Sequence, residues 1–276
     1  MAEEPSCCPD MNLERFYRGK VVVITGSSRG IGRETARRAL QAGARVVING
    51  RDPKALEEAK NSLGDVMAVI ADVSTPEGAL ALFSQALAGE GRVDVVIANA
   101  GLSMRGAFAD LVPATVRTMV EANFLTAVWT AQAALPALRS SSGRLVFVSS
   151  LAAIRGFPGV SLYSAAKMGL SAVHQSLGSE EPRVRSCLVY LPFTENDAEK
   201  TVLGADGKQF RHERRASMTQ TQAAQAILTA AAKGRRSTVL TAAGRILFLT
   251  QSFFPWLVDG FVRRSDGKIH SVRRSS

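Results

Sequence analysis

The strongest constraint on the fold is a regular alternation of short apolar runs with segments of helical periodicity. The runs KVVVIT, ARVVIN and GRLVFVSS are rich in Val, Ile and Leu. Strands without polar alternation are buried on both faces, as in parallel sheets that helices cover on both sides. We therefore predict an α/β fold in a single domain, a doubly wound, Rossmann-type parallel sheet of about seven strands with helices on both faces. The predicted strands are 20–25, 44–49, 66–73, 93–98, 143–150, 184–191 and 237–241, and the predicted helices are 30–42, 53–63, 75–88, 113–138, 219–233 and one that begins near 162.

The two ends of the chain differ from this central pattern. The start, MAEEPSCCPD, is acidic and lacks an apolar core, so it is not a signal peptide. We predict a flexible arm over 1–15. The α/β domain is predicted over 16–243, and it contains a polar, weakly periodic loop at about 193–218 that we expect to be mobile. An apolar and basic extension follows over 244–276.

Cysteine, histidine and charge limit the compartment and the partners. Three cysteines cannot form a disulfide framework, which suits a reducing compartment, and we expect the cytoplasm. The three histidines are widely separated, so no metal site is predicted. Nine basic residues oppose two acidic ones from Lys233 to the end. Such a tail suits anionic lipid or nucleic acid, but no basic groove with interleaved aromatics accompanies it, so we predict no nucleic-acid partner.

The stretch TGSSRGIG lies between the first predicted strand and the first predicted helix of the sheet. Its glycines allow a tight turn that brings backbone N–H groups close to a pyrophosphate, and the helix N-terminus adds partial positive charge. A plain glycine-rich turn is the alternative, but a turn that follows a strand and opens a helix favours dinucleotide binding. The candidate residues in this turn are Gly26, Ser28, Arg29, Gly30, Ile31 and Gly32.

The Gly-x-x-x-Gly-x-Gly spacing of this turn resembles the cofactor motif of the classical short-chain dehydrogenase/reductase (SDR) family. The resemblance covers roughly 19–192, with helices and strands in the same order. It implies that the loop at 193–218 is the substrate loop. It also implies adenine contacts from Asp72 and Val73, and a role for the Asn99-Ala100-Gly101 motif in stabilising the central sheet beside the cofactor.

The end of the second strand indicates which nicotinamide cofactor is used. An acid there would bind the adenosine ribose and repel a 2′-phosphate, but the strand ends Asn49-Gly50-Arg51. Arg51 and Arg29 together suit a bidentate phosphate clamp, so we predict NADP(H). Asp52 opposes this argument, and the alternative is that Arg51 is only a solvated loop charge.

The stretch YSAAK places Tyr163 and Lys167 one helical turn apart. With Ser150 and Asn123 upstream, they match the family's Asn, Ser, Tyr and Lys at the family's spacings. A tyrosine with a pKa near 10 needs a neighbouring cation to act at neutral pH. The resemblance implies that Tyr163 transfers a proton and that Lys167 lowers its pKa and holds the nicotinamide ribose. It further implies that Ser150 orients the substrate oxygen, and that Asn123 holds a water linked to Lys167.

The pattern breaks after the sixth strand, where the family usually has Pro-Gly. Pro192 is retained as a cofactor contact, but Phe193 replaces the glycine. We expect an NADP(H)-dependent oxidoreductase that interconverts a ketone and a secondary alcohol on an apolar or lipid-like substrate. The alternatives are a 3-oxoacyl or steroid-type carbonyl reductase, and a non-catalytic nucleotide-binding scaffold. The resemblance also implies a homodimer or homotetramer, paired through the long helix and the helix that carries Tyr163.

The segment 244–264 is the most apolar of the chain, and arginines flank it. Seventeen residues run from Ile246 to Val262, and Pro255 and Asp259 interrupt them. That is short and broken for a membrane span. Three interpretations stay open: packing over the substrate pocket or a subunit interface, peripheral contact with a membrane surface as a basic amphipathic helix, or a span.

Overall fold

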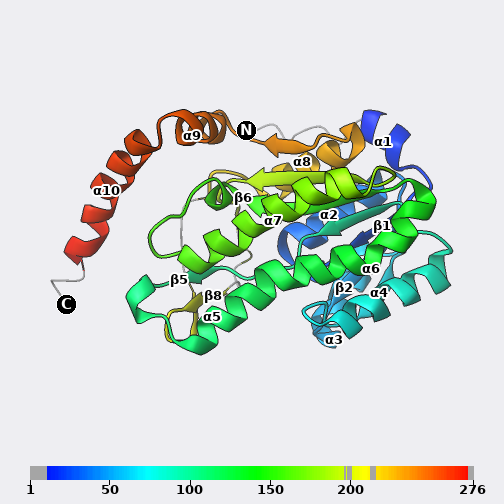
Figure 1. Ribbon diagram of the computed structural model, residues 1–276. Helices are drawn as coiled ribbons and strands as arrows, with labels where there is room; N and C mark the ends of the chain where they lie inside the picture. The colour runs from blue at the N-terminus through cyan, green and yellow to red at the C-terminus, as the bar shows by residue number, and fades with distance from the viewer. Residues whose placement is uncertain (1–10, 196, 198–200, 212–215, 273–276) are drawn as a thin grey trace, which may run out of the picture.

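The computed structural model describes residues 11–195, 197, 201–211 and 216–272. Its centre is a seven-stranded parallel sheet (Figure 1) in the order β10-β7-β6-β4-β1-β2-β3. The chain reverses its direction of winding between β1 and β4, at the switch point where such sheets bind ligands beyond the carboxyl ends of their strands. The predicted doubly wound fold is confirmed. The strands are β1 (Val21–Ile24), β2 (Arg45–Gly50), β3 (Met67–Ile70), β4 (Val95–Ala98), β6 (Arg144–Ser150), β7 (Arg185–Leu191) and β10 (Ser237–Val239).

Helices cover both faces of the sheet, because successive side chains of each strand point to opposite sides. Val22 and Ile24 of β1 join one buried cluster, with α1, α2, α3 and α8. Val21 and Val23 join the other, with α4, α6 and α7. The helices are α1 (Met11–Tyr17), α2 (Gly30–Gln41), α3 (Pro53–Leu63), α4 (Pro76–Glu90), α5 (Pro113–Val120), α6 (Thr126–Ser141), α7 (Ser161–Glu180) and α8 (Gln220–Lys233).

The arm predicted over 1–15 ends earlier than expected, because α1 begins at Met11. Leu13 and Tyr17 are buried, and the Tyr17 hydroxyl donates a hydrogen bond to the Leu228 carbonyl at 2.9 Å. Two apolar residues one turn apart are a weak sequence signal for a helix. Packing against α8 is therefore what stabilises α1. The first ten residues of the predicted arm lie outside the described residues.

The prediction of a mobile loop at 193–218 is wrong for the middle of this segment. It contains β8 (Thr201–Gly204) and β9 (Gln209–Arg211), which form an antiparallel hairpin. Strand β8 also pairs in parallel with β5 (Met104–Arg105). An Asp206-Gly207 turn joins the hairpin strands, with Gly207 at φ +83°. Asp-Gly between two strands is a recognised hairpin signal, so the sequence did carry this element.

The helix predicted over 113–138 is interrupted by a π-helical turn, η2 (Glu121–Leu125), between α5 and α6. Such turns occur frequently at functional sites. The C-terminal extension forms α9 (Ala242–Phe253) and α10 (Pro255–Val272), and Figure 1 shows α10 leading away from the body of the domain. Within the described residues, no helix is both long and apolar enough to span a bilayer.

Candidate functional site

The structure brings the predicted catalytic residues together at the carboxyl edge of the sheet. Ser150 is the last residue of β6, Tyr163 and Lys167 belong to α7, and Asn123 lies in the η2 turn. The side chain of Ser150 is close enough to Tyr163 to act on its pKa, which it lowers. The Ser150 hydroxyl oxygen also accepts the N–H of Ala152 at 3.1 Å, which fixes its rotamer at the start of a short 3₁₀ turn.

Lys167 is buried beneath this pair, with 4% of its surface exposed. Its Nζ donates to the Val148 carbonyl oxygen at 3.0 Å. Gly101, just after β4, makes room for it, since a Cβ there would lie 2.8 Å from Asn123 Oδ1 and 3.5 Å from Lys167 Nζ. A glycine at position 101 is therefore a condition for packing Asn123 against Lys167.

Asn123 is completely buried. Its Oδ1 accepts the N–H of Leu102 at 3.1 Å, and its Nδ2 donates to the carbonyls of Leu102 at 2.9 Å and Met119 at 3.2 Å. The side-chain amide thus fixes the segment that follows β4. The water-holding role remains a prediction.

Burial raises the pKa of Tyr163, and the hydrogen bond with Ser150 acts in the opposite direction. Lys167 was expected to lower this pKa. Its Nζ lies 5.9 Å from the centroid of the Tyr163 ring and donates to a backbone carbonyl, and its effect on this pKa stays a prediction. Burial in apolar surroundings favours the neutral phenol.

The glycine turn has the geometry of a phosphate cradle. Gly26 and Gly30 have φ of +62° and +58°, and a Cβ at Gly32 would lie 2.4 Å from the Gly26 carbonyl oxygen. Asn99 holds the turn against β4, because its Nδ2 donates to the carbonyls of Thr25 at 3.0 Å and Gly26 at 3.1 Å. Exposed backbone N–H groups at the start of α2 are suited to a pyrophosphate.

Sequence reasoning missed the role of Thr25 in this turn. Its hydroxyl oxygen accepts the N–H groups of Asn99 at 3.1 Å and Ala100 at 3.2 Å, so it joins the ends of β1 and β4. The position immediately after a buried strand was the available signal. Asn99 and Thr25 together explain why the turn is rigid.

Arg29 in the glycine turn and Arg51 after β2 are both exposed, and both lie near acidic groups. Arg29 Nη2 lies 3.9 Å from Asp52 Oδ2, and both side chains are more than half exposed, so this ion pair is weak. Burial alone would raise the pKa of Asp72, but hydrogen bonds from Ser74 and the charge of Arg51 bring it below its usual value. Both guanidiniums remain accessible to a 2′-phosphate.

Asn49, near the end of β2, is buried and bonded to Ser27 of the glycine turn: its N–H donates to the Ser27 Oγ at 2.9 Å, and its carbonyl accepts the Ser27 N–H at 2.9 Å. Its Nδ2 donates to the carbonyls of Val69 at 3.1 Å and Ala71 at 3.0 Å, which ties β2 to β3. Ser28 lies against Gly50, where a Cβ would be 3.3 Å from the Ser28 Oγ.

An acidic residue that the sequence did not single out lies beside the cradle. Asp197 Oδ1 accepts a hydrogen bond from Gln220 Nε2 at 2.8 Å. Its Oδ2 lies 3.5 Å from where a Cβ of Gly30 would stand. A carboxylate thus faces the position expected for an anionic ligand.

The substrate side of Tyr163 is apolar. A buried cluster of Met104, Met119 and Leu203 joins β5, α5 and β8, and Leu102, Val160, Leu162 and Tyr163 itself pack on it. The β5–β8 pairing therefore contributes to an apolar wall against which Tyr163 packs.

The segment after β7 is anchored by backbone contacts. Pro192 is buried, and the Phe193 carbonyl accepts from the N–H of Ser217 at 2.9 Å and from its hydroxyl at 3.0 Å. The Thr194 hydroxyl donates to the Pro192 carbonyl at 3.1 Å. Phe193 thus lies on a fixed strand-like segment at the edge of the site.

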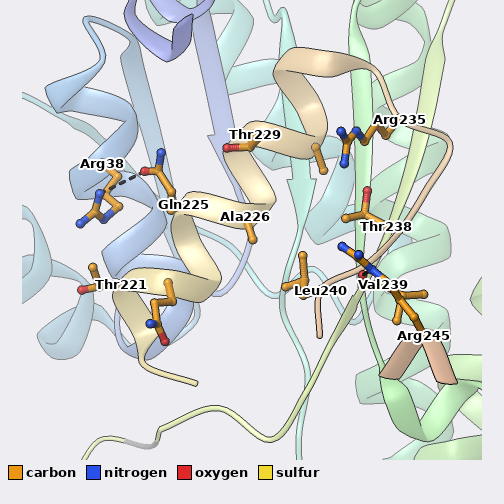
Figure 2. A pocket seen from close by; sticks show the side chains of 12 residues that line it. Arg38, Thr221, Gln225, Ala226, Thr229, Arg235, Thr238, Val239, Leu240 and Arg245 are labelled. Atoms are coloured by element: carbon orange, nitrogen blue, oxygen red, sulfur yellow. Dashed lines mark hydrogen bonds between the residues drawn. The ribbon is translucent and has the colours of Figure 1, made fainter. Parts of the chain in front are cut away.

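A cavity of about 380 Å³ lies elsewhere, between α2, α8 and β10 (Figure 2). Arg38, Arg235 and Arg245 are among its lining residues, and Arg38 donates to Gln225 at 3.1 Å. None of the predicted catalytic or cofactor residues lines it. In the described part of the chain, no cluster of His, Cys, Asp and Glu is arranged to hold a metal ion.

Comparison with known proteins gives a consistent result. The family model for short chain dehydrogenases matches residues 20–203. Dehydrogenase/reductase SDR family member 7B of Bos taurus is 32% identical over 246 residues, covering 83% of this chain and 76% of that protein. The 11-beta-hydroxysteroid dehydrogenase 1A of Arabidopsis thaliana is 35% identical over 173 residues, 60% of this chain and 49% of its own length.

Solved structures agree on the fold. An alcohol dehydrogenase from the archaeon Thermococcus sibiricus, complexed with 5-hydroxy-NADP, superposes with a TM-score of 0.71 at 25% identity, covering 81% of this chain and 96% of that one. A short chain dehydrogenase/reductase from Burkholderia phymatum in complex with NAD gives a TM-score of 0.77 at 19% identity, covering 88% and 96%. The second likeness concerns the fold alone.

Proposed function

The chain belongs to the short chain dehydrogenase family, and on that premise we propose that it is an NADP(H)-dependent oxidoreductase with Tyr163 as its general acid and base. Membership makes it an oxidoreductase of alcohol or ketone groups that uses a nicotinamide cofactor. The observation that carries the proposal is the placement of Ser150, Tyr163 and buried Lys167 together at the carboxyl edge of the sheet.

The chemistry follows from the positions of these side chains. The nicotinamide, when bound, supplies or accepts the hydride. In reduction, the Ser150 hydroxyl orients the ketone oxygen, and Tyr163 gives its proton to that oxygen as hydride reaches the carbon. The products are the secondary alcohol, the oxidised cofactor and a tyrosinate, which recovers a proton from solvent. The raised pKa of Tyr163 favours the protonated phenol, which is the form that reduction needs.

The residues present fit a dinucleotide. The turn offers backbone N–H groups, the exposed guanidiniums of Arg29 and Arg51 suit a 2′-phosphate, and Lys167 would hold the nicotinamide ribose. The proposed cofactor-binding set is Gly26, Ser28, Arg29, Gly30, Ile31, Gly32, Arg51, Asp72, Val73, Asn99, Ala100, Gly101, Tyr163, Lys167 and Pro192.

The apolar wall beside Tyr163 supports an apolar or lipid-like ketone as substrate. Plant relatives with the name 11-beta-hydroxysteroid dehydrogenase make a steroid-like ketone a candidate within this class. A 3-oxoacyl chain is the second candidate, since an extended aliphatic chain suits the same wall.

We also propose a homodimer or homotetramer in the cytoplasm. The outer face of α7 exposes Ala165, Met168 and Ala172 at helical spacing, a flat surface that suits helix pairing between subunits. Cys187 is a free buried thiol, in keeping with a reducing compartment. A monomeric mass by light scattering would contradict the oligomer.

The test is titration of the purified protein with NADPH and with NADH, followed by nicotinamide fluorescence and then by a screen of steroid and 3-oxoacyl ketones. Preferential binding of NADPH and reduction of a ketone support the proposal. Preference for NADH overturns the cofactor assignment but leaves the proposed reaction unchanged. Binding of neither cofactor would make the chain a scaffold, with Phe193 as the cause.

A further inference from the structure

The α9–α10 tail concentrates exposed apolar surface. Eight of the sixteen large apolar side chains that are exposed in the described part of the chain lie between Ile246 and Phe261. At the junction of the helices, the rings of Phe254 and Trp256 meet edge to face with centroids 6.5 Å apart, and both are at least half exposed. A patch of this kind on a surface usually marks a binding site.

The apolar residues form a face on each helix. Ile246, Leu249 and Phe253 of α9 are spaced three and four residues apart and are 65%, 57% and 71% exposed. Leu257 and Phe261 of α10 are one turn apart and 48% and 72% exposed. A surface helix of a globular protein normally turns its apolar face inward, and here that face points to solvent.

The opposite faces hold the tail to the catalytic domain. A Cβ at Gly244 would lie 2.8 Å from the side chain of Leu151, the residue after Ser150. The Phe248 and Tyr190 ring centroids are 6.3 Å apart. Asp259 forms an ion pair with Arg155 at 3.0 Å. The charge that interrupts the apolar segment is therefore directed to the domain.

We propose that this face, residues 246–261 of α9 and α10, docks on the surface of an anionic lipid bilayer. Aromatic and aliphatic side chains would enter the headgroup region, and Arg245, Arg263 and Arg264, which are exposed at its two ends, would meet anionic headgroups. Docking does not depend on the proposed reaction. It would bring the mouth of the Ser150–Tyr163 site next to the bilayer.

The charge of the tail argues against a second copy of the chain as the binding partner of residues 246–261. A two-fold contact would place this face against itself, and with it the tail's excess of nine basic over two acidic residues from Lys233 onward. Like charges across an interface oppose association, whereas an anionic surface attracts each of them. The apolar face of residues 246–261 does not pack over the chain's own substrate pocket, since its side chains stay exposed.

The first experiment is co-sedimentation with vesicles of phosphatidylcholine, or of equal parts phosphatidylcholine and phosphatidylserine. Leu249→Ala is compared with Leu80→Ala, because both leucines are 57% exposed and Leu80 lies on α4. We expect binding to the anionic vesicles, weakened by salt. Leu249→Ala should weaken it roughly tenfold, by the area lost, and Leu80→Ala should leave it unchanged. The triple variant that combines Leu249→Ala, Phe253→Ser and Trp256→Ser should abolish vesicle binding.

A second measurement keeps the apolar face intact. Trp129 and Trp256 are the two tryptophans, so Trp129→Phe leaves Trp256 as the reporter. A blue shift of its emission on anionic vesicles is expected, and Arg263→Gln with Arg264→Gln should weaken binding about tenfold or more. Absence of both sedimentation and shift overturns the proposal. So does a Leu249→Ala variant that changes the oligomeric mass without changing vesicle binding.

Discussion

The Nζ of Lys167 lies 5.9 Å from the centroid of the Tyr163 ring and donates to the Val148 carbonyl oxygen at 3.0 Å. The cation is buried beside Asn123, and both side chains occupy the space that Gly101 leaves open. Hydrogen bonding with Ser150 lowers the pKa of Tyr163, against the larger effect of burial. In the proposed mechanism, Ser150 therefore influences the pKa of the general acid as well as the position of the substrate oxygen.

Removal of one hydroxyl tests the proposed general acid. Tyr163→Phe should lower kcat for ketone reduction by about 10²–10⁴-fold, the usual contribution of proton transfer. NADPH affinity should change little, since the ring remains. Tyr190→Phe is the matched control: it removes a hydroxyl bonded to Ser171 at 3.2 Å, away from the proton-transfer path. Equal losses in both variants would contradict the assignment.

The pH dependence follows from the raised pKa of Tyr163. Reduction needs the protonated phenol, so kcat/KM for the ketone should stay level through neutral pH and fall only in alkali. Oxidation needs the phenolate and should rise over the same alkaline range. Ser150→Ala removes the interaction that lowers this pKa, so the normalised profile of the residual activity should move to higher pH. A shift to lower pH would refute the role of the Ser150 hydrogen bond in setting this pKa.

The fold was largely predictable because its signals are local and repeated. Runs rich in Val and Ile predict the parallel strands, and Pro53 after Asp52 predicts the start of α3, where the Asp52 side chain accepts the N–H groups of Lys54 and Ala55. Helix α1 and the β8–β9 hairpin were missed. Helix α1 depends on a contact with the distant helix α8. The hairpin had a local Asp-Gly signal, but its pairing with β5 joins segments far apart in the chain.

The site was predictable in its residues and less so in its electrostatics. Spacing along the chain placed Asn123, Ser150, Tyr163 and Lys167 correctly at one edge of the sheet. The spacing could not give the relative effects of burial and of a neighbouring cation on the pKa of Tyr163, because these depend on where the Lys167 Nζ points. The carboxylate of Asp197 at the cradle could not be foreseen either, since it follows the last matching strand.

The cofactor assignment rests on two guanidiniums. Arg51→Ala should raise the Kd for NADPH about ten- to hundredfold, as expected for losing a charge-assisted hydrogen bond, and should leave the Kd for NADH unchanged. Asp52→Asn should favour NADPH while still capping α3. Arg45→Ala, at the other end of β2, is the control for a general loss of positive charge. Parallel losses for both cofactors would place Arg51 outside the 2′-phosphate site.

Gly101 should tolerate no side chain. Gly101→Ala would push a methyl group against Asn123 Oδ1 and towards Lys167 Nζ, so kcat should fall at least about tenfold and stability by about 1–3 kcal/mol, as in overpacked cores. Gly260→Ala is the comparison, because nothing lies within 4 Å of its Cβ position and alanine favours the helix. Turnover and thermal unfolding of both variants measure the difference.

Asp197 should oppose cofactor binding, because its carboxylate faces Gly30 in the phosphate cradle. Asp197→Asn keeps an acceptor for Gln220 and removes the charge, so the Kd for NADPH should fall about five- to tenfold at low salt. The gain should shrink as salt screens the repulsion. Asp206→Asn, in the exposed hairpin turn, makes the same change in net charge away from the cradle and should have no such effect. Equal gains from both substitutions would mean that total charge, and not the position of Asp197, sets the affinity.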